Sequence, residues 1–155
     1  MASWGISSLD LSEVGRSSRS LESGNSTRDV TRRDERCAFV AIVEDDVYVL
    51  RSMDRLLRAA GCRTKSFTSA EEFLDQMDSN MFSCLVLDVS LQGMNGLELQ
   101  GQLFRLQHRI PIVFVTAVDL EDVKTAALQA GAIAFLPKPV NEGDLLKAVH
   151  SALGE

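Results

Sequence analysis

Acidic residues stand directly after two apolar runs of the chain, and their types and positions suit chemistry. Asp88 follows the uncharged run 84–87, and the acidic triplet 44–46 (Glu-Asp-Asp) follows the apolar run 38–43. Short apolar runs of this kind are typical of strands that are buried on both faces of a parallel sheet. Because ligands bind at the carboxyl ends of the strands in open sheets of this type, Asp88 is the leading candidate for the residue that carries out the chemistry.

The apolar patterning of the chain predicts the elements that must position these acids. Five strands are expected, at residues 38–43, 62–67, 84–88, 111–116 and 132–136. Apolar residues at helical spacing predict five helices, at about 49–60, 70–78, 95–108, 123–130 and 145–153. In the third helix, Leu97 and Phe104 are expected on the inner face. The alternation of strands and helices predicts an α/β fold, a parallel sheet with helices on both faces and right-handed crossovers.

Because parallel strands end at one edge of a sheet, the acids can converge with Thr116 at the end of the fourth strand and Lys138 after the fifth. Crowded carboxylates repel one another unless a cation lies among them, and carboxylates with waters and phosphate oxygens are the ligands that Mg²⁺ prefers. A lysine and a hydroxyl at the same place supply the charge and the donor that phosphoryl oxygens need. Aspartate can act as a nucleophile that forms an aspartyl phosphate. The constellation therefore predicts phosphoryl transfer onto a carboxylate.

The composition of the 155 residues, 45% apolar and 25% charged, is typical of one globular domain with a tail. The net charge of -6 lies entirely on residues 37–155, which carry ten Lys and Arg against sixteen Asp and Glu. An acidic domain is not expected to bind nucleic acid directly, because phosphate neutralisation needs a basic patch. The sequence has no apolar run of about 20 residues and no secretory signal, so a cytoplasmic protein without a membrane span is expected.

Residues 1–36 are rich in Ser, Arg and Glu and never sustain a helical or strand period. A segment of this composition cannot bury enough apolar surface to offset the entropy of ordering it. We therefore expect a disordered N-terminal extension at 1–36 and the domain at 37–155. A docking or phosphorylation segment is the alternative interpretation of the extension.

The three cysteines, Cys37, Cys62 and Cys84, are odd in number and far apart in the sequence. This spacing matches neither a disulfide framework nor a zinc site. We expect them to be small, inert core residues.

Four short motifs at the predicted strand ends resemble a known family, the receiver domain of two-component response regulators. The motifs are Val43-Glu44-Asp45-Asp46, Leu87-Asp88-Val89 with Gly93-Met94-Asn95-Gly96, Val115-Thr116-Ala117, and Phe135-Leu136-Pro137-Lys138-Pro139. Each motif alone is weak, but four in this order are specific, and the resemblance covers roughly residues 38–153. The stretch 67–74 (Phe-Thr-Ser-Ala-Glu-Glu-Phe-Leu) is most similar to the FixJ-type branch. The resemblance implies a flavodoxin-like, doubly wound sheet of five parallel strands in the order 2-1-3-4-5, with five helices.

The resemblance implies that Asp88 accepts a phosphoryl group from the phosphohistidine of a sensor histidine kinase or of a phosphotransfer protein. The receiver itself would catalyse this transfer and the later loss of the phosphoryl group, so it is not expected to be a conventional enzyme. The implied cofactor is Mg²⁺, and its implied ligands are Glu44, Asp45, Asp88 and the backbone carbonyl of Ser90. Lys138 would pair with the phosphate.

The resemblance also implies a conformational signal. Thr116 would turn inward to donate to the phosphate, and this movement would free space for Phe135 to rotate inward. The surface at residues 119–136 would change as a result. That surface is the expected interface for a homodimer or for an output protein whose identity the sequence does not reveal.

Two assignments within the motifs stay open. The metal pair is either Glu44 and Asp45 or the next register, Asp45 and Asp46. The first register is preferred, because it aligns Gly61 with the terminal glycine of the family's first helix. Gln92 stands where the family usually has proline, so the loop after Asp88 is expected to be more flexible.

A degenerate receiver that binds partners without phosphorylation is the main alternative function. A small aspartate-nucleophile phosphatase is disfavoured, because those enzymes need a second acid two residues after the nucleophile and that position is Ser90. A flavodoxin-like cofactor binder is disfavoured, because acids follow the first strand and would repel the cofactor's phosphate. The chain is expected to be a stand-alone receiver or one excised from a longer protein, and the first is preferred.

Overall fold

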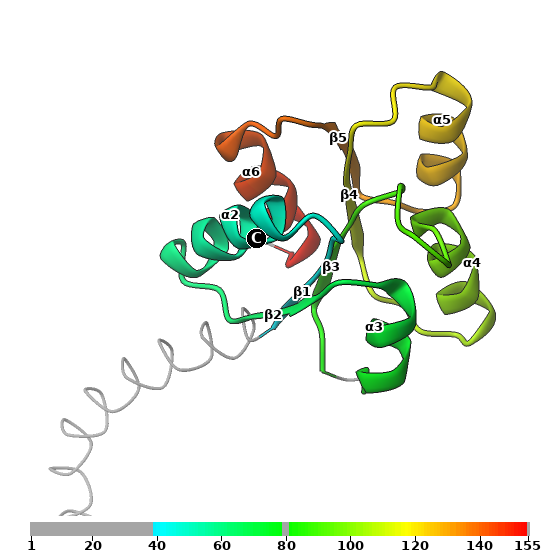
Figure 1. The fold of residues 1–155 in the computed structure, drawn as a ribbon, viewed down its shortest axis with the longest axis horizontal. Coiled ribbons are helices and arrows are strands. Elements are labelled where there is room, and N and C mark those ends of the chain that lie inside the picture. The colour runs from blue at the N-terminus through cyan, green and yellow to red at the C-terminus, as the bar shows by residue number, and fades with distance from the viewer. Residues whose placement is uncertain (1–38, 79–80, 155) are drawn as a thin grey trace, which may run out of the picture. The chain divides into compact units, whose positions relative to one another are not determined.

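The structure, a computed structural model, describes residues 39–78 and 81–154 (Figure 1). The strands in this part of the chain are β1 (Val40–Val43), β2 (Thr64–Phe67), β3 (Cys84–Leu87), β4 (Ile112–Thr116) and β5 (Ala134–Pro137). The helices are α2 (Val47–Ala59), α3 (Ala70–Gln76), α4 (Gly96–Arg105), α5 (Glu121–Gln129) and α6 (Glu142–Ala152). Strands and helices alternate as the sequence predicts, and every element lies within a few residues of its expected position.

The extension predicted at residues 1–36 lies outside the described residues, and so does Cys37. The disorder of the extension and the domain boundary at residue 37 therefore stay predictions. Within the described ranges, no helix has the length and apolar character that a membrane-spanning helix needs.

The five strands form one parallel sheet in the order β2-β1-β3-β4-β5. This order confirms the predicted doubly wound topology. In the pairing of β1 with β3, Val43 lies opposite Leu87, so the residues that follow them, Glu44 and Asp88, stand at the same edge of the sheet. The strand order reverses between these two strands, and ligands bind at such a switch point.

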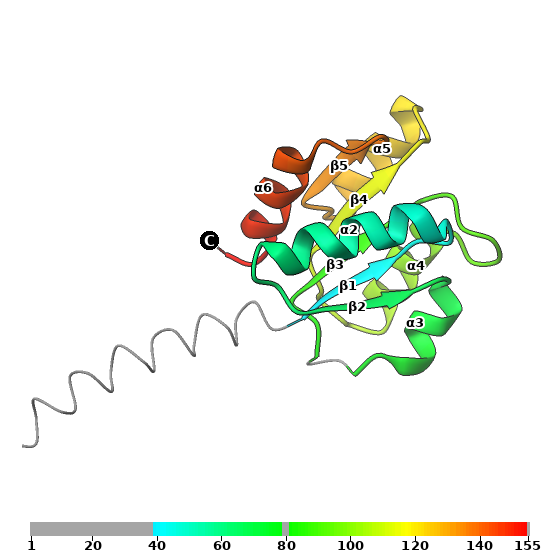
Figure 2. The same cartoon turned by 60° about the vertical axis from the view of Figure 1, so that its left-hand side comes forward.

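Helices cover both faces of the sheet, with α2 and α6 on one face and α3, α4 and α5 on the other (Figures 1 and 2). Residues of β1 alternate between the two cores that result. Ala41 and Val43 pack with the core under α3, α4 and α5, whereas Val40 and Ile42 pack with the core under α2 and α6. Because both faces are covered, every residue of β1 is buried, which explains its continuous apolar sequence.

Polar side chains cap four of the helices and fix where they begin. The capping residues Asp46, Ser69, Asn95 and Asn141 each accept a backbone N–H from the first turn of their helix. Asn95 also forms a full capping box with Glu98. Two of these caps lie in the loops that carry the acids, Asp46 after β1 and Asn95 after β3.

The expectation that Phe104 lies on the inner face of α4 is wrong, because 77% of this residue is exposed. The buried positions of the helix include Leu99 and Leu103 instead, one turn apart on the same face. Gln100 is buried beside them, and its Nε2 donates to the Ala127 carbonyl at 3.0 Å. This bond satisfies a polar group that would otherwise be costly to bury.

Cys62 and Cys84 are buried, as expected, and we expect the Cys84 thiol to be almost inert in the folded protein. Burial raises the pKa of the Cys84 thiol to about 12. At pH 8 its thiolate fraction is then about 10³-fold below that of an ordinary cysteine. In a Cys37→Ser background, Cys84 should react with an alkylating reagent at least about 10³-fold more slowly in the native than in the urea-unfolded protein. Peptide mass spectrometry measures the rates, and equal rates in the two states would contradict this placement.

Candidate functional site

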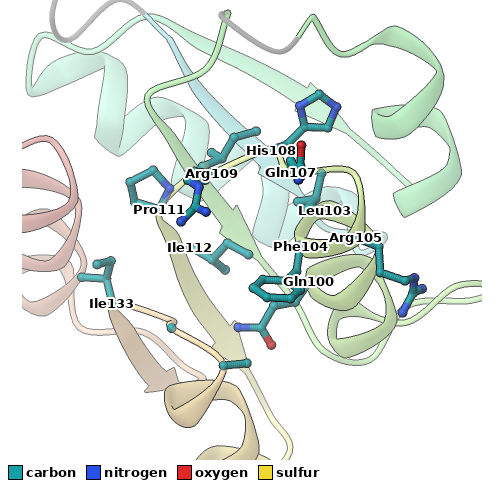
Figure 3. Close-up of a pocket in the computed structure, with 13 residues that line it drawn as sticks. Gln100, Leu103, Phe104, Arg105, Gln107, His108, Arg109, Pro111, Ile112 and Ile133 are labelled. Atoms are coloured by element: carbon teal, nitrogen blue, oxygen red, sulfur yellow. The ribbon is translucent and has the colours of Figure 1, made fainter.

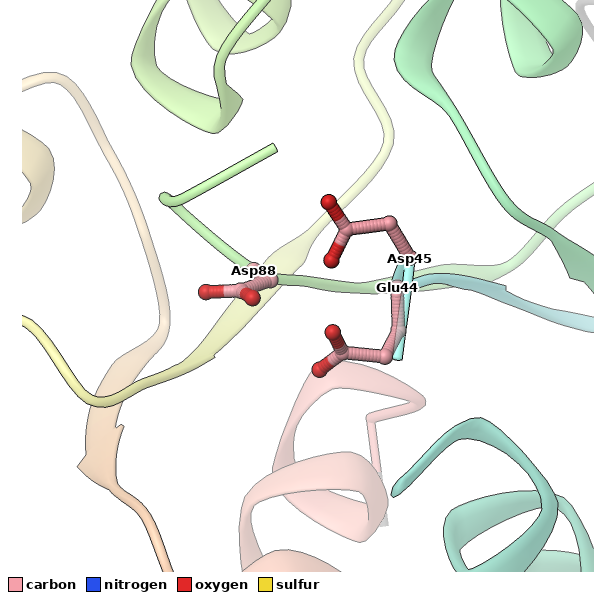
Figure 4. A group of neighbouring side chains, drawn as sticks. All are labelled: Glu44, Asp45 and Asp88. Atoms are coloured by element: carbon pink, nitrogen blue, oxygen red, sulfur yellow. The ribbon is translucent and has the colours of Figure 1, made fainter. Parts of the chain in front are cut away.

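Three carboxylates meet at the carboxyl edge of the sheet, where β1 and β3 end (Figure 4). Glu44 and Asp45 follow β1 and Asp88 follows β3, and one carboxylate oxygen from each lies within 4.8 Å of the others. Asp88 is only 4% exposed and Glu44 has no exposed surface, whereas Asp45 is exposed. The structure thus brings together the three acids that the sequence groups as a site.

Lys138 joins this cluster from the end of β5. Its Nζ lies 2.6 Å from Glu44 Oε1 and 3.0 Å from Asp88 Oδ2. The backbone N–H of Lys138 donates to the Thr116 carbonyl at 3.0 Å, so the pairing of β5 with β4 places the lysine at the acids. Burial alone would lower the pKa of the Lys138 ammonium, but hydrogen bonds to Glu44 and Asp88 outweigh it and raise that pKa. Lys138 is therefore charged at neutral pH.

Glu44 is the most deeply buried acid of the site. Burial raises the pKa of its carboxyl, and the Lys138 ammonium and the Asp46 N–H offset only part of this effect. Oε2 accepts the Asp46 N–H at 3.1 Å. Oε1 is fully buried and is paired with the Lys138 ammonium, whose Nζ lies 2.6 Å away. The lysine ammonium thus compensates the charge of this buried oxygen.

The donor set fits a hard divalent cation. Mg²⁺ prefers oxygen ligands and keeps several waters, so one or two carboxylates are enough to hold it. Asp45 and Asp88 offer such oxygens, and the buried Glu44 adds charge behind them. Asp88 Oδ1 accepts the Ser90 N–H at 3.1 Å, which orients the carboxylate. Ser90 thus takes part in the site through its amide, and the role of its carbonyl as a metal ligand stays a prediction.

Asp46, the alternative member of the metal pair, is the N-cap of α2. Its Oδ1 accepts the Tyr48 N–H at 2.9 Å and the Val49 N–H at 3.3 Å. The Asp46 carboxylate therefore caps the helix. The acids that group with Asp88 are Glu44 and Asp45. The geometry favours the preferred register.

Substitution should separate the roles of the two neighbouring aspartates. Asp46→Ala removes the cap, so it should lower the free energy of unfolding by about 1 kcal/mol and leave the Mg²⁺ affinity nearly unchanged. Asp45→Ala should instead weaken Mg²⁺ binding by about tenfold or more, with little effect on stability in EDTA. Urea unfolding and calorimetric Mg²⁺ titration measure the two effects. A loss of Mg²⁺ affinity in the Asp46 variant alone would reverse the assignment.

The two residues of the predicted switch lie on neighbouring strands. Thr116 ends β4, is 1% exposed, and its hydroxyl accepts the Val118 N–H at 3.2 Å. Phe135 in β5 is half-buried and pairs with Phe114 of β4, with ring centroids 5.9 Å apart. Each side chain thus has defined contacts in this structure. The predicted inward movements of Thr116 and Phe135 stay predictions.

A pocket of about 590 Å³ lies apart from the acids, beside the amino ends of β4 and β5 (Figure 3). Its lining includes Leu103, Phe104, Arg109 and Ile133. The acids end the strands at the other edge of the parallel sheet, so this pocket takes no part in their chemistry.

Two further residues support the acids although no local pattern assigns them this role. The N–H of Gly96 donates to the Val89 carbonyl at 2.9 Å, and a Cβ at Gly96 would overlap the Asp88 carbonyl oxygen. Glu71 Oε2 accepts the Met94 N–H at 2.7 Å. Gly96 belongs to one of the motifs, which marks it as a turn residue. Glu71 carries no such signal, because its contact joins residues 23 positions apart.

Comparison with known proteins gives the same family as the motifs. Residues 40–150 match the response regulator receiver domain. Nodulation protein W of Bradyrhizobium diazoefficiens is 42% identical over 115 residues, which are 74% of this chain and 51% of that protein. The transcriptional regulatory protein FixJ of the same organism is 31% identical over 114 residues, 74% of this chain and 56% of that protein. The solved structure of the response regulator StyR aligns with a TM-score of 0.72 and 42% identity, over 76% of this chain and 59% of that one.

The chain spans about half the length of the curated relatives it matches. The matched residues include the acids after β1, Asp88 and Lys138. A receiver domain is a signalling module and does not form a conventional class of enzyme. The fold, the motifs and the comparisons together show that this chain belongs to the response regulator receiver domain family of two-component systems.

Proposed function

We propose that this receiver takes a phosphoryl group onto Asp88 from the phosphohistidine of a sensor histidine kinase or of a phosphotransfer protein, in a reaction that needs Mg²⁺. The observation that carries the proposal is the setting of the Asp88 carboxylate. It is almost buried, it lies within 4.8 Å of two other acids, and it is 3.0 Å from the Lys138 ammonium. Burying like charges together is costly, so this arrangement favours a functional role over a purely structural one.

The transfer follows from the positions of these groups. An Asp88 carboxylate oxygen attacks phosphorus, the O–P bond forms, and the P–N bond to the donor imidazole breaks while its nitrogen takes up a proton from solvent. Lys138 Nζ, already 3.0 Å from Asp88 Oδ2, supplies positive charge beside the oxygens of the incoming group. Mg²⁺ held by Asp45 and Asp88 would neutralise further negative charge on those oxygens. Hydrolysis of the aspartyl phosphate returns the receiver to its starting state.

The signal is proposed to be a conformational shift next to the acceptor. Phosphate oxygens on Asp88 would attract the Thr116 hydroxyl, which now accepts only from the backbone amide of Val118 among the described contacts. Its movement would leave room for Phe135 to turn inward. Phosphorylation would thereby bias an equilibrium between two arrangements that the receiver already samples.

The proposed partners of the shifted state are proteins. The surface at residues 119–136 exposes large apolar side chains, with Leu120 62%, Leu128 39% and Ile133 42% exposed. Such side chains suit a homodimer or an output protein. We also propose that the receiver works in the cytoplasm. Its net charge of -6 supports the proposal that it does not bind nucleic acid directly.

Intact-protein mass spectrometry tests the proposal. After incubation with acetyl phosphate and Mg²⁺, the wild type should gain one phosphoryl group, and it should gain none in EDTA. Asp88→Asn keeps the shape of the side chain and should abolish the adduct, whereas the control Asp46→Asn should keep it. An unchanged adduct on Asp88→Asn would contradict the assignment. No adduct from acetyl phosphate or from a panel of histidine kinases would favour the alternative, a degenerate receiver that binds partners without phosphorylation.

A further inference from the structure

The loop at residues 88–95 joins β3 to α4 and carries the acceptor aspartate. At the start of the loop, the N–H of Asp88 donates to the Val43 carbonyl at 3.1 Å. At the other end, the N–H of Gly96 donates back to the start of the loop at 2.9 Å. Residues 92–94 lie between these anchors, so their support must come from other elements.

Glu71, in the first turn of α3, supports this middle part of the loop. Its Oε2 accepts the Met94 N–H at 2.7 Å, a short bond that is typical of a charged acceptor. The bond also lowers the pKa of the Glu71 carboxyl, so the acceptor is ionised at neutral pH. The same oxygen lies against Gly93, where a Cβ would be 2.6 Å from it, and Gly93 has a φ of +78° that favours glycine. The carboxylate is thus both bonded to the turn and packed against it.

The other side of this turn contacts the acid cluster. The N–H of Gln92 donates to Asp45 Oδ2, with N and O 3.4 Å apart. Gln92 can make this contact because, unlike a proline, it has a backbone N–H. One amide of the turn therefore contacts an acid of the site, and a second amide, two residues later, donates to Glu71.

We infer that Glu71 is a positioning residue for the acceptor site: from α3 its carboxylate fixes the 92–94 turn, which in turn fixes Asp45 and the loop that carries Asp88. This inference rests on the proposed function, because the groups that are positioned are the phosphoryl acceptor and its neighbouring acid. The bond from the Met94 N–H to Glu71 restricts the turn. Without the contact, the acids are less well ordered for binding a cation and for transfer.

Hydrogen exchange in the full chain provides a readout that does not depend on phosphorylation. The Met94 amide should exchange at least about tenfold faster in Glu71→Ala than in the wild type, because its acceptor is gone. Glu71→Gln keeps an acceptor oxygen and should stay within about threefold of the wild type. Asp75→Ala, which changes an exposed acid one turn further along the same helix, is the matched control and should leave the amide unchanged. Thermal unfolding verifies that each variant is folded.

Metal binding and phosphoryl uptake provide the second readout. Glu71→Ala should weaken Mg²⁺ binding about tenfold and slow uptake from acetyl phosphate, whereas Glu71→Gln and Asp75→Ala should resemble the wild type. Unchanged Met94 exchange in Glu71→Ala would overturn the inference. Faster exchange with unchanged Mg²⁺ affinity and uptake would overturn it as well, because the contact would then be only structural. A wild type that takes up no phosphoryl group would instead contradict the proposed function, whatever the exchange data show.

Discussion

Lys138→Met is expected to lower the free energy of unfolding by about 3 kcal/mol at pH 7 in EDTA, because it leaves buried acids without their cation. Lys138 Nζ lies 2.6 Å from Glu44 Oε1 and 3.0 Å from Asp88 Oδ2. The lysine side chain is 18% exposed and the Glu44 side chain only 1%, so water screens this pair weakly. EDTA matters in this measurement, since a bound metal ion would take over part of the lysine's role.

The stability deficit of Lys138→Met, the amount by which its free energy of unfolding falls below that of the wild type, should depend on pH. The pKa of Lys138 is raised in the folded protein, so its contribution is fully present below the unfolded value of about 10.4 and is lost as pH rises through the folded value. The pKa of Glu44 is also raised, so its burial is favoured at low pH and becomes costly as pH rises through the folded value. In the variant no ammonium offsets this cost. The deficit should therefore shrink from pH 7 toward pH 5, and again above about pH 10.5.

Urea unfolding at about pH 5, 7, 9 and 11 measures this dependence. Lys147→Met is the matched control, because Lys147 is an exposed lysine on α6, and it should change stability by less than about 0.5 kcal/mol. The double variant Glu44→Gln, Lys138→Met should recover part of the loss, because the buried group is then neutral. A Lys138→Met protein as stable as the wild type, or a deficit independent of pH, would contradict the proposed pairing.

Gly96→Ala is expected to slow phosphoryl uptake by about 10²-fold and to lower the free energy of unfolding by about 2 kcal/mol. A Cβ at this position would overlap the Asp88 carbonyl oxygen and would lie 2.9 Å from the Val89 Cα. These atoms belong to backbone, which cannot move aside as a flexible side chain can. The acceptor loop must therefore shift, and small displacements of reacting groups have large effects on rate.

Gly101→Ala is a matched control in the same helix. The nearest atom to a Cβ at Gly101 is Arg105 Nη1 at 3.6 Å, an ordinary contact distance. Alanine inside a helix is more stable than glycine, so this variant should gain about 0.5–1 kcal/mol and keep its phosphoryl uptake. Urea unfolding and the mass assay compare the two variants. If both alanines had the same effect on uptake, close packing at Gly96 would not be the cause.

The sequence predicts the sheet and the meeting of the acids because both follow from local features. β1 and β3 are buried on both faces, so their residues form continuous apolar runs. Once the strands are parallel, topology places Glu44, Asp88 and Lys138 at one edge whatever the details of side-chain packing. The edge of the sheet that carries the site could therefore be predicted from residue patterns, whereas the strand order is implied only by the resemblance to the receiver family.

Tertiary contacts decide the features that the sequence does not predict. Leu103 and Phe104 are adjacent and apolar, and only the packing of α4 against the core decides which of them is buried. The pairing of Lys138 with the fully buried Glu44 depends on how deeply that acid lies, which no motif reveals. A contact between two side chains far apart in the sequence leaves no repeating pattern of residue types, so it cannot be predicted from the sequence as a helix or strand can.

The central claim is that Asp88 carries the phosphoryl group, and chemical mapping of the phosphorylated residue tests it most directly. Borohydride reduces an aspartyl phosphate to homoserine, so the wild type would be incubated with acetyl phosphate and Mg²⁺, reduced, digested and sequenced by mass spectrometry. We expect homoserine at position 88 in the Mg²⁺ sample and at no position in the EDTA sample. Homoserine at Asp45 or Asp46, or the same product with and without Mg²⁺, would contradict the proposed site.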